Sequence, residues 1–170
     1  MIKLNCDNYL IKQTLTNYLE NKSISLASEN ESYFTTINIR ANKKNISLII
    51  GSHGIEFSIP VDLNFLSSEI LKSIADINLK ISGYNYYPYQ RLVENSKKRS
   101  LLSDIQSIIL NNILLSKEGV DKEFLYKRVW KRDKSIQINK LDTHLTNFKN
   151  KLNDDLDLNI NFHSYEKKLR

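Results

Sequence analysis

Polar side chains with the spacing of a helix surface lie near the C-terminal end of the chain. From residue 138 to 152, apolar residues recur at intervals of three and four, which predicts one buried face and one exposed face. Amides and hydroxyls on an exposed helix can hydrogen-bond to base edges in the major groove of DNA, which admits one α-helix. An ordinary solvated helix surface is the alternative, because the chain is rich in asparagine throughout. The exposed set is Asn139, Lys140, Thr143, Thr146, Asn147 and Asn150.

Basic residues surround this helix and could meet phosphate groups. The chain has 170 residues and a formal net charge of +6. Residues 1–82 carry eight basic and eight acidic side chains, whereas residues 83–170 carry 17 basic and 11 acidic ones, so the whole excess lies in the second half. This distribution favours a polyanionic partner, with a solvated lysine-rich surface as the alternative. The candidate phosphate contacts are Lys149 and Lys151 on the helix, Lys131, Arg132 and Lys134 before it, and Lys167, Lys168 and Arg170 at the end of the chain.

The elements that must position this helix begin with a hairpin and a first helix. The aromatic and polar residues from 84 to 93 favour a β-hairpin, followed by a polar turn. Ser103 or Asp104 then caps a helix with an aliphatic face, and Gly119 supplies a stop signal after it. We expect these elements to form the beginning of a domain that spans residues 83–170.

The remaining elements of this domain are two helices and a second hairpin. Asp121 caps a short helix that reaches Trp130, and the long helix over 138–152 follows a basic loop. The alternating residues 158–162 predict a strand that turns back into 167–170. A short helix, a longer helix with a polar outer face and a terminal hairpin make the order typical of a winged helix-turn-helix domain.

Residues 1–82 predict a small α/β domain, which gives the whole chain an α+β fold class. Asp7 or Asn8 caps a helix after a short first strand, and leucines and isoleucines at helical spacing predict a helix over 63–79. This second helix either covers the sheet or forms a dimer surface, and the sequence does not separate these roles. The boundary between the domains is expected near Ser82–Gly83. The predicted strands are 2–6, 34–40, 46–50 and 55–61.

Several classes of function are excluded by composition and spacing. Cys6 is the single cysteine, and His53, His144 and His163 are far apart, so neither a disulfide, a metal site nor a catalytic histidine pair is expected. The chain has four glycines and lacks both nucleotide-binding glycine motifs. No apolar run approaches the ~18 residues of a membrane span, and no signal peptide is evident. We expect a cytoplasmic protein without enzymatic activity or cofactor.

Two segments of the second half resemble the effector domains of OmpR/PhoB-type response regulators. Gly119 to Trp130 is similar to the family segment that ends in a Val-Trp pair. Leu141 to Leu152 resembles the family's recognition helix, with its Asp-x-His and Lys-x-Leu elements. Asn147 and Lys149 stand where the family usually has arginines, which removes bidentate guanidinium contacts. The likeness covers about half of the chain.

The resemblance implies a role for each part of the second half. Helix 138–152 would be the recognition helix, loop 131–137 would contact RNA polymerase, and hairpin 158–170 would be a wing in the minor groove. Asn139 and Lys140 would lie at the groove entrance, Asp142, Thr143 and Asn147 would face bases, and His144 would approach a phosphate.

The family usually carries a receiver domain in front, and residues 1–82 resemble a shortened one. The strand over 2–6 with Asp7, and Ile59–Pro60 followed by the helix over 63–79, match the receiver's first strand and its last strand end and helix. Phosphoryl transfer would need an acceptor aspartate after the central strand, and here Gly51 follows. We therefore predict that this domain is not phosphorylated.

The sequence thus predicts a sequence-specific, DNA-binding transcriptional regulator that acts without phosphorylation. The expected partners are double-stranded DNA, RNA polymerase and a second copy of the chain, bound through the N-terminal domain, with no membrane association. One alternative is a winged-helix adaptor that binds RNA polymerase or another regulator instead of DNA. Another is a regulator switched by phosphorylation.

Overall fold

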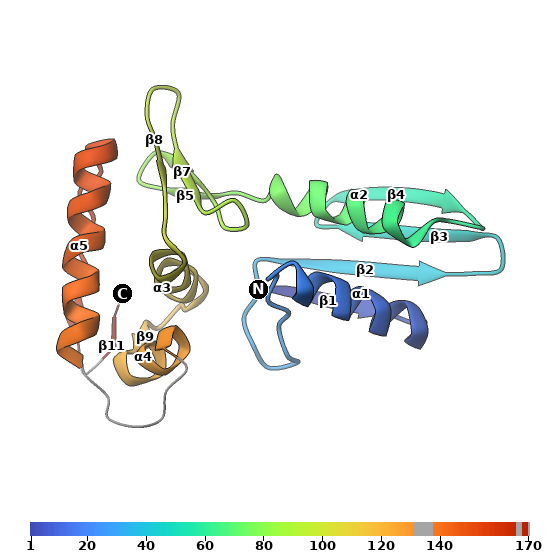
Figure 1. The fold of residues 1–170 in the computed structure, drawn as a ribbon, viewed down its shortest axis with the longest axis horizontal. Helices are drawn as coiled ribbons and strands as arrows, with labels where there is room; N and C mark the ends of the chain where they lie inside the picture. Colours follow the sequence, from blue (N-terminus) through green and yellow to red (C-terminus); the bar gives the residue numbers. More distant parts are fainter. Residues whose placement is uncertain (131–137, 166–167, 170) are drawn as a thin grey trace. The chain divides into compact units, whose positions relative to one another are not determined.

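The chain folds into two compact units, Met1–Ile77 and Asn78–Arg170 (Figure 1). The computed structural model describes residues 1–130, 138–165 and 168–169. Both units combine helices and strands, so the α+β class is confirmed. The division lies five residues before the expected boundary at Ser82–Gly83, because strand β5 (Leu79–Ile81) pairs with β6 (Tyr84–Tyr87) and belongs to the second unit.

The first unit is built on a four-stranded sheet with the order β1-β2-β3-β4. Its strands are β1 (Ile2–Cys6), β2 (Thr35–Ala41), β3 (Asn45–Ile50) and β4 (His53–Ser58). Only β1 and β2 run parallel, and β2, β3 and β4 form an antiparallel meander. This corrects the expectation of a receiver-like α/β domain, whose sheet is parallel. The connections after β2 and β3 are too short for the crossover that a parallel neighbour needs.

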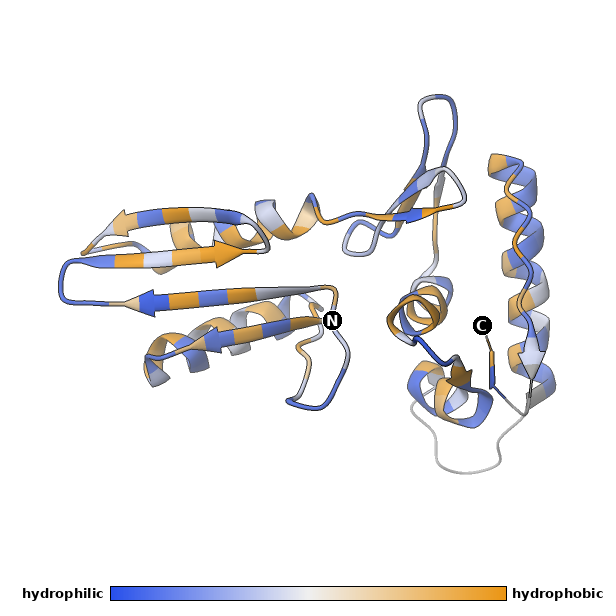
Figure 2. Ribbon diagram, turned by 180° about the vertical axis from the view of Figure 1, so that it is seen from behind, coloured by the Kyte–Doolittle hydropathy of each residue, from blue (hydrophilic) through white to orange (hydrophobic). Residues whose placement is uncertain are grey.

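Two helices cover one face of this sheet. Apolar and polar residues alternate along β1 and the middle of β2, as the colours in Figure 2 show, and Ile2, Leu4, Ile37 and Leu48 are buried on the same face. Helix α1 (Tyr9–Asn21) begins where the Asn8 side chain accepts a hydrogen bond from the Ile11 amide. Its leucines complete one side of the apolar layer.

Helix α2 (Leu63–Ala75) supplies the other part of this layer. Asp62 caps it by accepting a hydrogen bond from the Asn64 amide. Leu66, Ile70 and Ile74 are fully or almost fully buried. Of the two roles left open for this helix, its apolar stripe therefore covers the sheet. The helix ends at Ala75, four residues earlier than predicted, because Leu79 begins β5.

The second unit begins with an antiparallel sheet of order β5-β6-β7-β8. The predicted hairpin is its central pair, β6 with β7 (Leu92–Glu94), and β8 (Arg99–Leu101) lies at the outer edge. Helix α3 (Asp104–Leu115) follows. Ser103 is its cap, in a reciprocal capping box with Gln106.

The central helix of the second unit is α5 (Ile138–Leu156). It follows β9 (Val120–Asp121) and α4 (Lys122–Trp130), whose first turn is capped by the Asp121 carboxylate. The buried stripe on α5 runs one turn beyond the predicted end at residue 152. It comprises Leu141, Leu145, Phe148, Leu152 and Leu156, which pack into the core of the unit.

The terminal hairpin differs from the sequence prediction. Residues 158–162 are not a strand. Leu158 is buried, and Ile160 and Phe162 pack against the core, so the alternation reflects an extended segment that packs without pairing. The paired strands are β10 (Ser164–Tyr165) and β11 (Lys168–Leu169), and β11 also pairs with β9.

Phe148→Ala should strongly destabilise the second unit. The ring is fully buried between α5 and the core, so its removal should lower the free energy of unfolding by about 3–5 kcal/mol. Urea denaturation followed by the fluorescence of Trp130, the single tryptophan, measures this unit. Asn147→Ala, which alters the exposed neighbouring residue, is the control and should change the free energy of unfolding by less than about 0.5 kcal/mol. Similar losses for both variants would contradict the packing of α5.

Candidate nucleic-acid interface

The packing of α5 determines which of its side chains reach the surface. Because the leucines and Phe148 face the core, the opposite side of the helix is exposed. Its exposed residues form what we call the polar face: Asn139, Thr143, Thr146, Asn147 and Asn150. These are all members of the set that the sequence predicted to point outward, and Lys140 is exposed beside them.

The two threonines of the polar face use their hydroxyl hydrogens locally. Thr143 Oγ1 donates to the Asn139 carbonyl at 2.9 Å, and Thr146 Oγ1 donates to the Asp142 carbonyl at 3.0 Å. These bonds fix the rotamers of both side chains. The hydroxyl oxygens keep lone pairs that can accept hydrogen bonds, and the methyl groups offer apolar contact. The polar face therefore presents acceptors, amides and methyl groups rather than charge.

Trp130 organises the side chains at the beginning of α5. The Lys140 ammonium lies 4.6 Å from the centroid of its ring, a cation–π contact. The centroid of the His144 ring lies 5.3 Å from that of the Trp130 ring, and the centroid of the Tyr126 ring lies 4.5 Å from the same Trp130 ring. His144 is half-buried in this cluster, so the structure places it against α4 rather than on the polar face.

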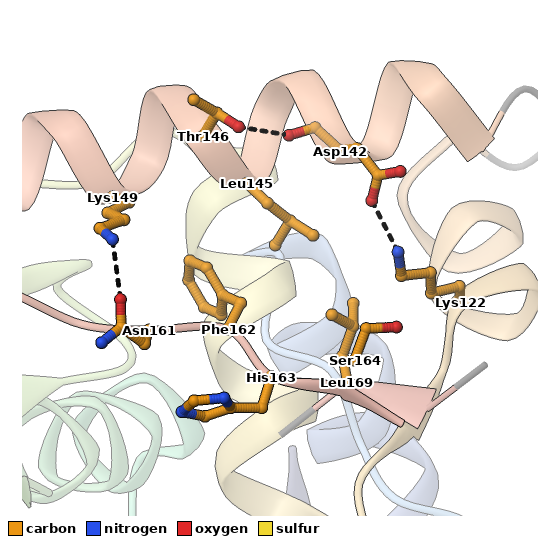
Figure 3. A pocket seen from close by; sticks show the side chains of 10 residues that line it. All are labelled: Lys122, Asp142, Leu145, Thr146, Lys149, Asn161, Phe162, His163, Ser164 and Leu169. Atoms are coloured by element: carbon orange, nitrogen blue, oxygen red, sulfur yellow. Dashed lines mark hydrogen bonds and ion pairs between the residues drawn. The ribbon is translucent and has the colours of Figure 1, made fainter. Parts of the chain in front are cut away.

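Asp142 forms an ion pair instead of pointing away from the protein. Its Oδ1 accepts from the Lys122 ammonium at 2.8 Å, and the Lys122 side chain is only 17% exposed (Figure 3). The pair joins α5 to the start of α4 and neutralises the carboxylate. The resemblance had placed Asp142 toward the bases. In the structure its charge is compensated from within the protein.

A hollow of about 360 Å³ lies between α5 and the C-terminal segment. Figure 3 shows Lys149 reaching across it to Asn161, whose Oδ1 accepts from the ammonium at 2.7 Å. This bond ties the extended segment before β10 to the side of α5. The hollow is lined by Lys122, Asp142, Leu145, Thr146, Lys149, Asn161, Phe162, His163, Ser164 and Leu169.

Lys151 belongs to a separate polar contact with the first sheet of the unit. Its ammonium lies 2.7 Å from Oδ2 of Asp155, one turn later on α5, and the Ser100 hydroxyl of β8 donates to the same oxygen. Hydrogen bonds from Lys151 and then from Ser100 lower the pKa of the Asp155 carboxyl from its usual 3.8. Lys151 is thus engaged on the side of α5 away from Lys149.

The excess positive charge of the second unit does not lie on α5. Three lysines and three aspartates give this helix no net charge. Lys168 on β11 is exposed, and its Nζ atom lies 3.8 Å from Oε2 of Glu118, which makes a long ion pair. The other predicted phosphate contacts lie outside the described residues: Lys131, Arg132, Lys134, Lys167 and Arg170.

Sequence reasoning missed three residues that shape this surface. Lys122 neutralises Asp142, Trp130 holds Lys140 and His144, and Asn161 binds Lys149. The type of residue at Trp130 was a usable signal, because the face of a tryptophan ring can bind a lysine such as Lys140. The other two contacts join positions 20 and 12 residues apart, and no local pattern reveals them.

Two kinds of site are not found in the described part of the chain. Among these residues, no three histidine, cysteine or acidic side chains gather closely enough to hold a metal ion. The described helices also include none with the length and apolar character needed to cross a membrane.

Comparison with known proteins gives no assignment. No model of a known protein family matches the chain, and a search of curated proteins finds no match either.

Asp155→Asn should make the stability of the second unit less dependent on acid pH. The lowered pKa means that the carboxylate stabilises the fold above pH 3.8, its value in the unfolded chain, and that this contribution is lost as the pH falls further. The variant should be less stable than the parent at about pH 6, and the difference should shrink as the pH falls below 3.8. Urea denaturation at each pH measures this.

Asp154→Asn is the matched control, since it changes the neighbouring exposed carboxylate. Its stability curve should run parallel to that of the parent protein. If both variants converge on the parent at low pH to the same degree, the contact of Asp155 with Lys151 and Ser100 does not stabilise the fold.

Proposed function

We propose that the protein is a DNA-binding transcriptional regulator that places α5 in the major groove. One observation carries this proposal: the buried stripe of α5 leaves a continuous face of amides, hydroxyls and methyl groups on an exposed helix of the second unit. Asparagine can form paired hydrogen bonds with adenine, and the methyl group of threonine can contact the thymine methyl. Asn147 and Thr143 are the residues we assign to base contact.

The proposed architecture is a winged helix-turn-helix. Helix α4 would be the supporting helix, α5 the recognition helix and the hairpin of β10 and β11 the wing. The order of these elements supports this assignment, as does the pairing of β11 with β9 in front of α4. The ion pair between Lys122 and Asp142 would hold the two helices at a fixed angle.

Affinity for DNA would come mostly from lysines and arginines outside the polar face. Since α5 has no net charge, its main contribution is selectivity, and most phosphate contacts must be made by other parts of the unit. Lys140, held over Trp130, is the lysine of α5 best placed for a phosphate, because its neighbours orient the side chain without neutralising it. Binding should therefore weaken steeply as salt is added.

The regulator would act without phosphorylation. The strand β3 is followed by Gly51 and Ser52 rather than by an acceptor aspartate. Asp7, at the end of β1, accepts a hydrogen bond from the Ala41 amide at 3.3 Å, which gives this carboxylate a structural role. Incubation with acetyl phosphate should leave the protein unlabelled.

A second candidate function is an adaptor that uses the same fold to bind RNA polymerase or another regulator. The absence of net charge on α5 favours it, because most recognition helices gain affinity from basic residues. This protein would contact its partner through the basic segment 131–137, which lies outside the described residues.

Asn147→Ala should weaken binding to a selected DNA site by about 5–150-fold, because one paired contact to a base contributes roughly 1–3 kcal/mol. Sites would first be selected from random or genomic fragments with the full chain. Affinity would then be measured by fluorescence anisotropy at two salt concentrations. Non-specific binding should change little.

Asn153→Ala is the matched control, an exposed asparagine about 120° away around the α5 axis. It should bind the selected site like the parent protein. If no DNA fragment is bound in a salt-sensitive way, the adaptor is the better proposal. If Asn147→Ala binds normally, α5 is not the recognition helix.

A further inference from the structure

The outer strand of the first unit, β4, is open along its free edge. It lies at one end of the sheet order β1-β2-β3-β4, and most of its residues are exposed. The opposite edge is covered at its beginning, because Ile2 of β1 exchanges backbone hydrogen bonds with Ser25 and Ala27. Within residues 1–77, which the structure describes completely, no strand or isolated bridge pairs with the outer side of β4.

The direction of these groups follows from the ladder with β3. The Ile59 amide donates to the Lys44 carbonyl, which makes residues 44 and 59 a hydrogen-bonded pair. Pairs alternate in an antiparallel ladder, so Ile55 and Phe57 also direct their backbone groups toward β3. Gly54, Glu56 and Ser58 must then direct theirs toward the free edge.

Natural edge strands are usually protected by lysines, prolines or bulges. The segment His53–Ser58 contains neither lysine nor proline, and its single charged side chain, Glu56, accepts a hydrogen bond from Asn45 at 2.9 Å. Large exposed apolar residues are also frequent in this part of the sequence. Of the eleven in the described chain, five lie between positions 49 and 65: Ile49, Ile55, Ile59, Leu63 and Phe65.

We propose that β4 pairs with β4 of a second copy of the chain, so that two four-stranded sheets join into one. A closed dimer with two-fold symmetry requires antiparallel pairing of a strand with itself. Gly54 of each copy would form a hydrogen-bonded pair with Glu56 of the other. Ile55 would then lie opposite its own counterpart in a non-hydrogen-bonded pair, where side chains approach most closely.

Charge and length select this register. If the strands were centred on Glu56, two carboxylates would face each other, which is unfavourable. If they were centred on Gly54, Phe57 would extend past the turn at Gly51 and lose its partner strand. The register centred on Ile55 places Glu56 opposite a glycine and Phe57 opposite His53.

The same register covers apolar surface on the helical side of the sheet. Ile55 is 37% exposed, and Phe57 packs edge-on against Phe65 of α2 with ring centroids 5.8 Å apart. Side chains of Ile55 from both copies would fill the space between these two aromatic pairs. We therefore expect β4 of a second copy at this edge, because that strand matches both the hydrogen-bonding groups of β4 and its apolar side chains, Ile55 and Phe57.

A disulfide between two copies tests the register directly. Cys6→Ser removes the single natural thiol, and Ile55→Cys then introduces one cysteine per chain. Opposed non-hydrogen-bonded residues have Cα atoms about 4.5 Å apart, which a disulfide can bridge. Mild oxidation of the full chain should give a dimer that persists on a non-reducing gel.

Ile49→Cys in the same background is the matched control. Ile49 is 36% exposed, close to the value for Ile55, but it lies on β3, one strand further from the free edge. Its two copies would be separated by about three strand spacings, or roughly 14 Å, so they should remain unlinked. Equal cross-linking of both variants would overturn the proposal.

Sedimentation velocity provides an independent test with the unmodified chain. At about 100 µM we expect twice the monomer mass of 19.9 kDa. Ile55→Lys should weaken the dimer at least about tenfold, because two ammonium groups would oppose each other, whereas Ile49→Lys should not. A parent protein that remains monomeric, or a dimer that tolerates Ile55→Lys, would overturn the proposal. DNA binding by a monomer would leave the proposed function intact.

Discussion

The burial of one apolar stripe on α5 is the constraint on which the second unit depends. Five side chains on this helix enter the core, together with residues from the first sheet, α3 and α4. A stripe of this length permits a single rotation of the helix about its axis. That rotation decides at once that the amides and threonines face outward, that Asp142 meets Lys122 and that Lys149 reaches Asn161. The surface chemistry of the unit is therefore a consequence of its core.

Much of the fold could be predicted from local patterns in the sequence. The predictions that were wrong concerned which segments pair as β-strands. Caps at Asn8, Ser103 and Asp121 lie where short polar side chains precede apolar periodicity, and each was expected from the sequence or was one of two candidates. The strand predicted at 158–162 was wrong, since alternation shows that a segment is half-buried and not that it has a partner. The short strands β5 and β8 have three residues each, too few for a period.

The candidate interface could be predicted only as a helix face. Periodicity separated exposed from buried positions on α5 correctly, because it depends on residues three and four apart. It could not show that His144 turns toward Trp130, or that Lys151 pairs with Asp155 while Lys149 pairs elsewhere. These choices depend on side chains brought close by other elements. The number of lysines on α5 therefore overestimated the positive charge available to a partner, because Lys149 and Lys151 are engaged by other side chains.

The position of β5 has a practical consequence for anyone who separates the two units. Leu79 and Ile81 pack against the core of the second unit, and their strand covers one side of β6. A fragment that starts at Gly83 would leave the backbone of β6 open and prone to intermolecular aggregation. A fragment that starts at Asn78 keeps the sheet whole. Three residues that look like part of a linker thus decide whether the second unit can be prepared as a soluble fragment.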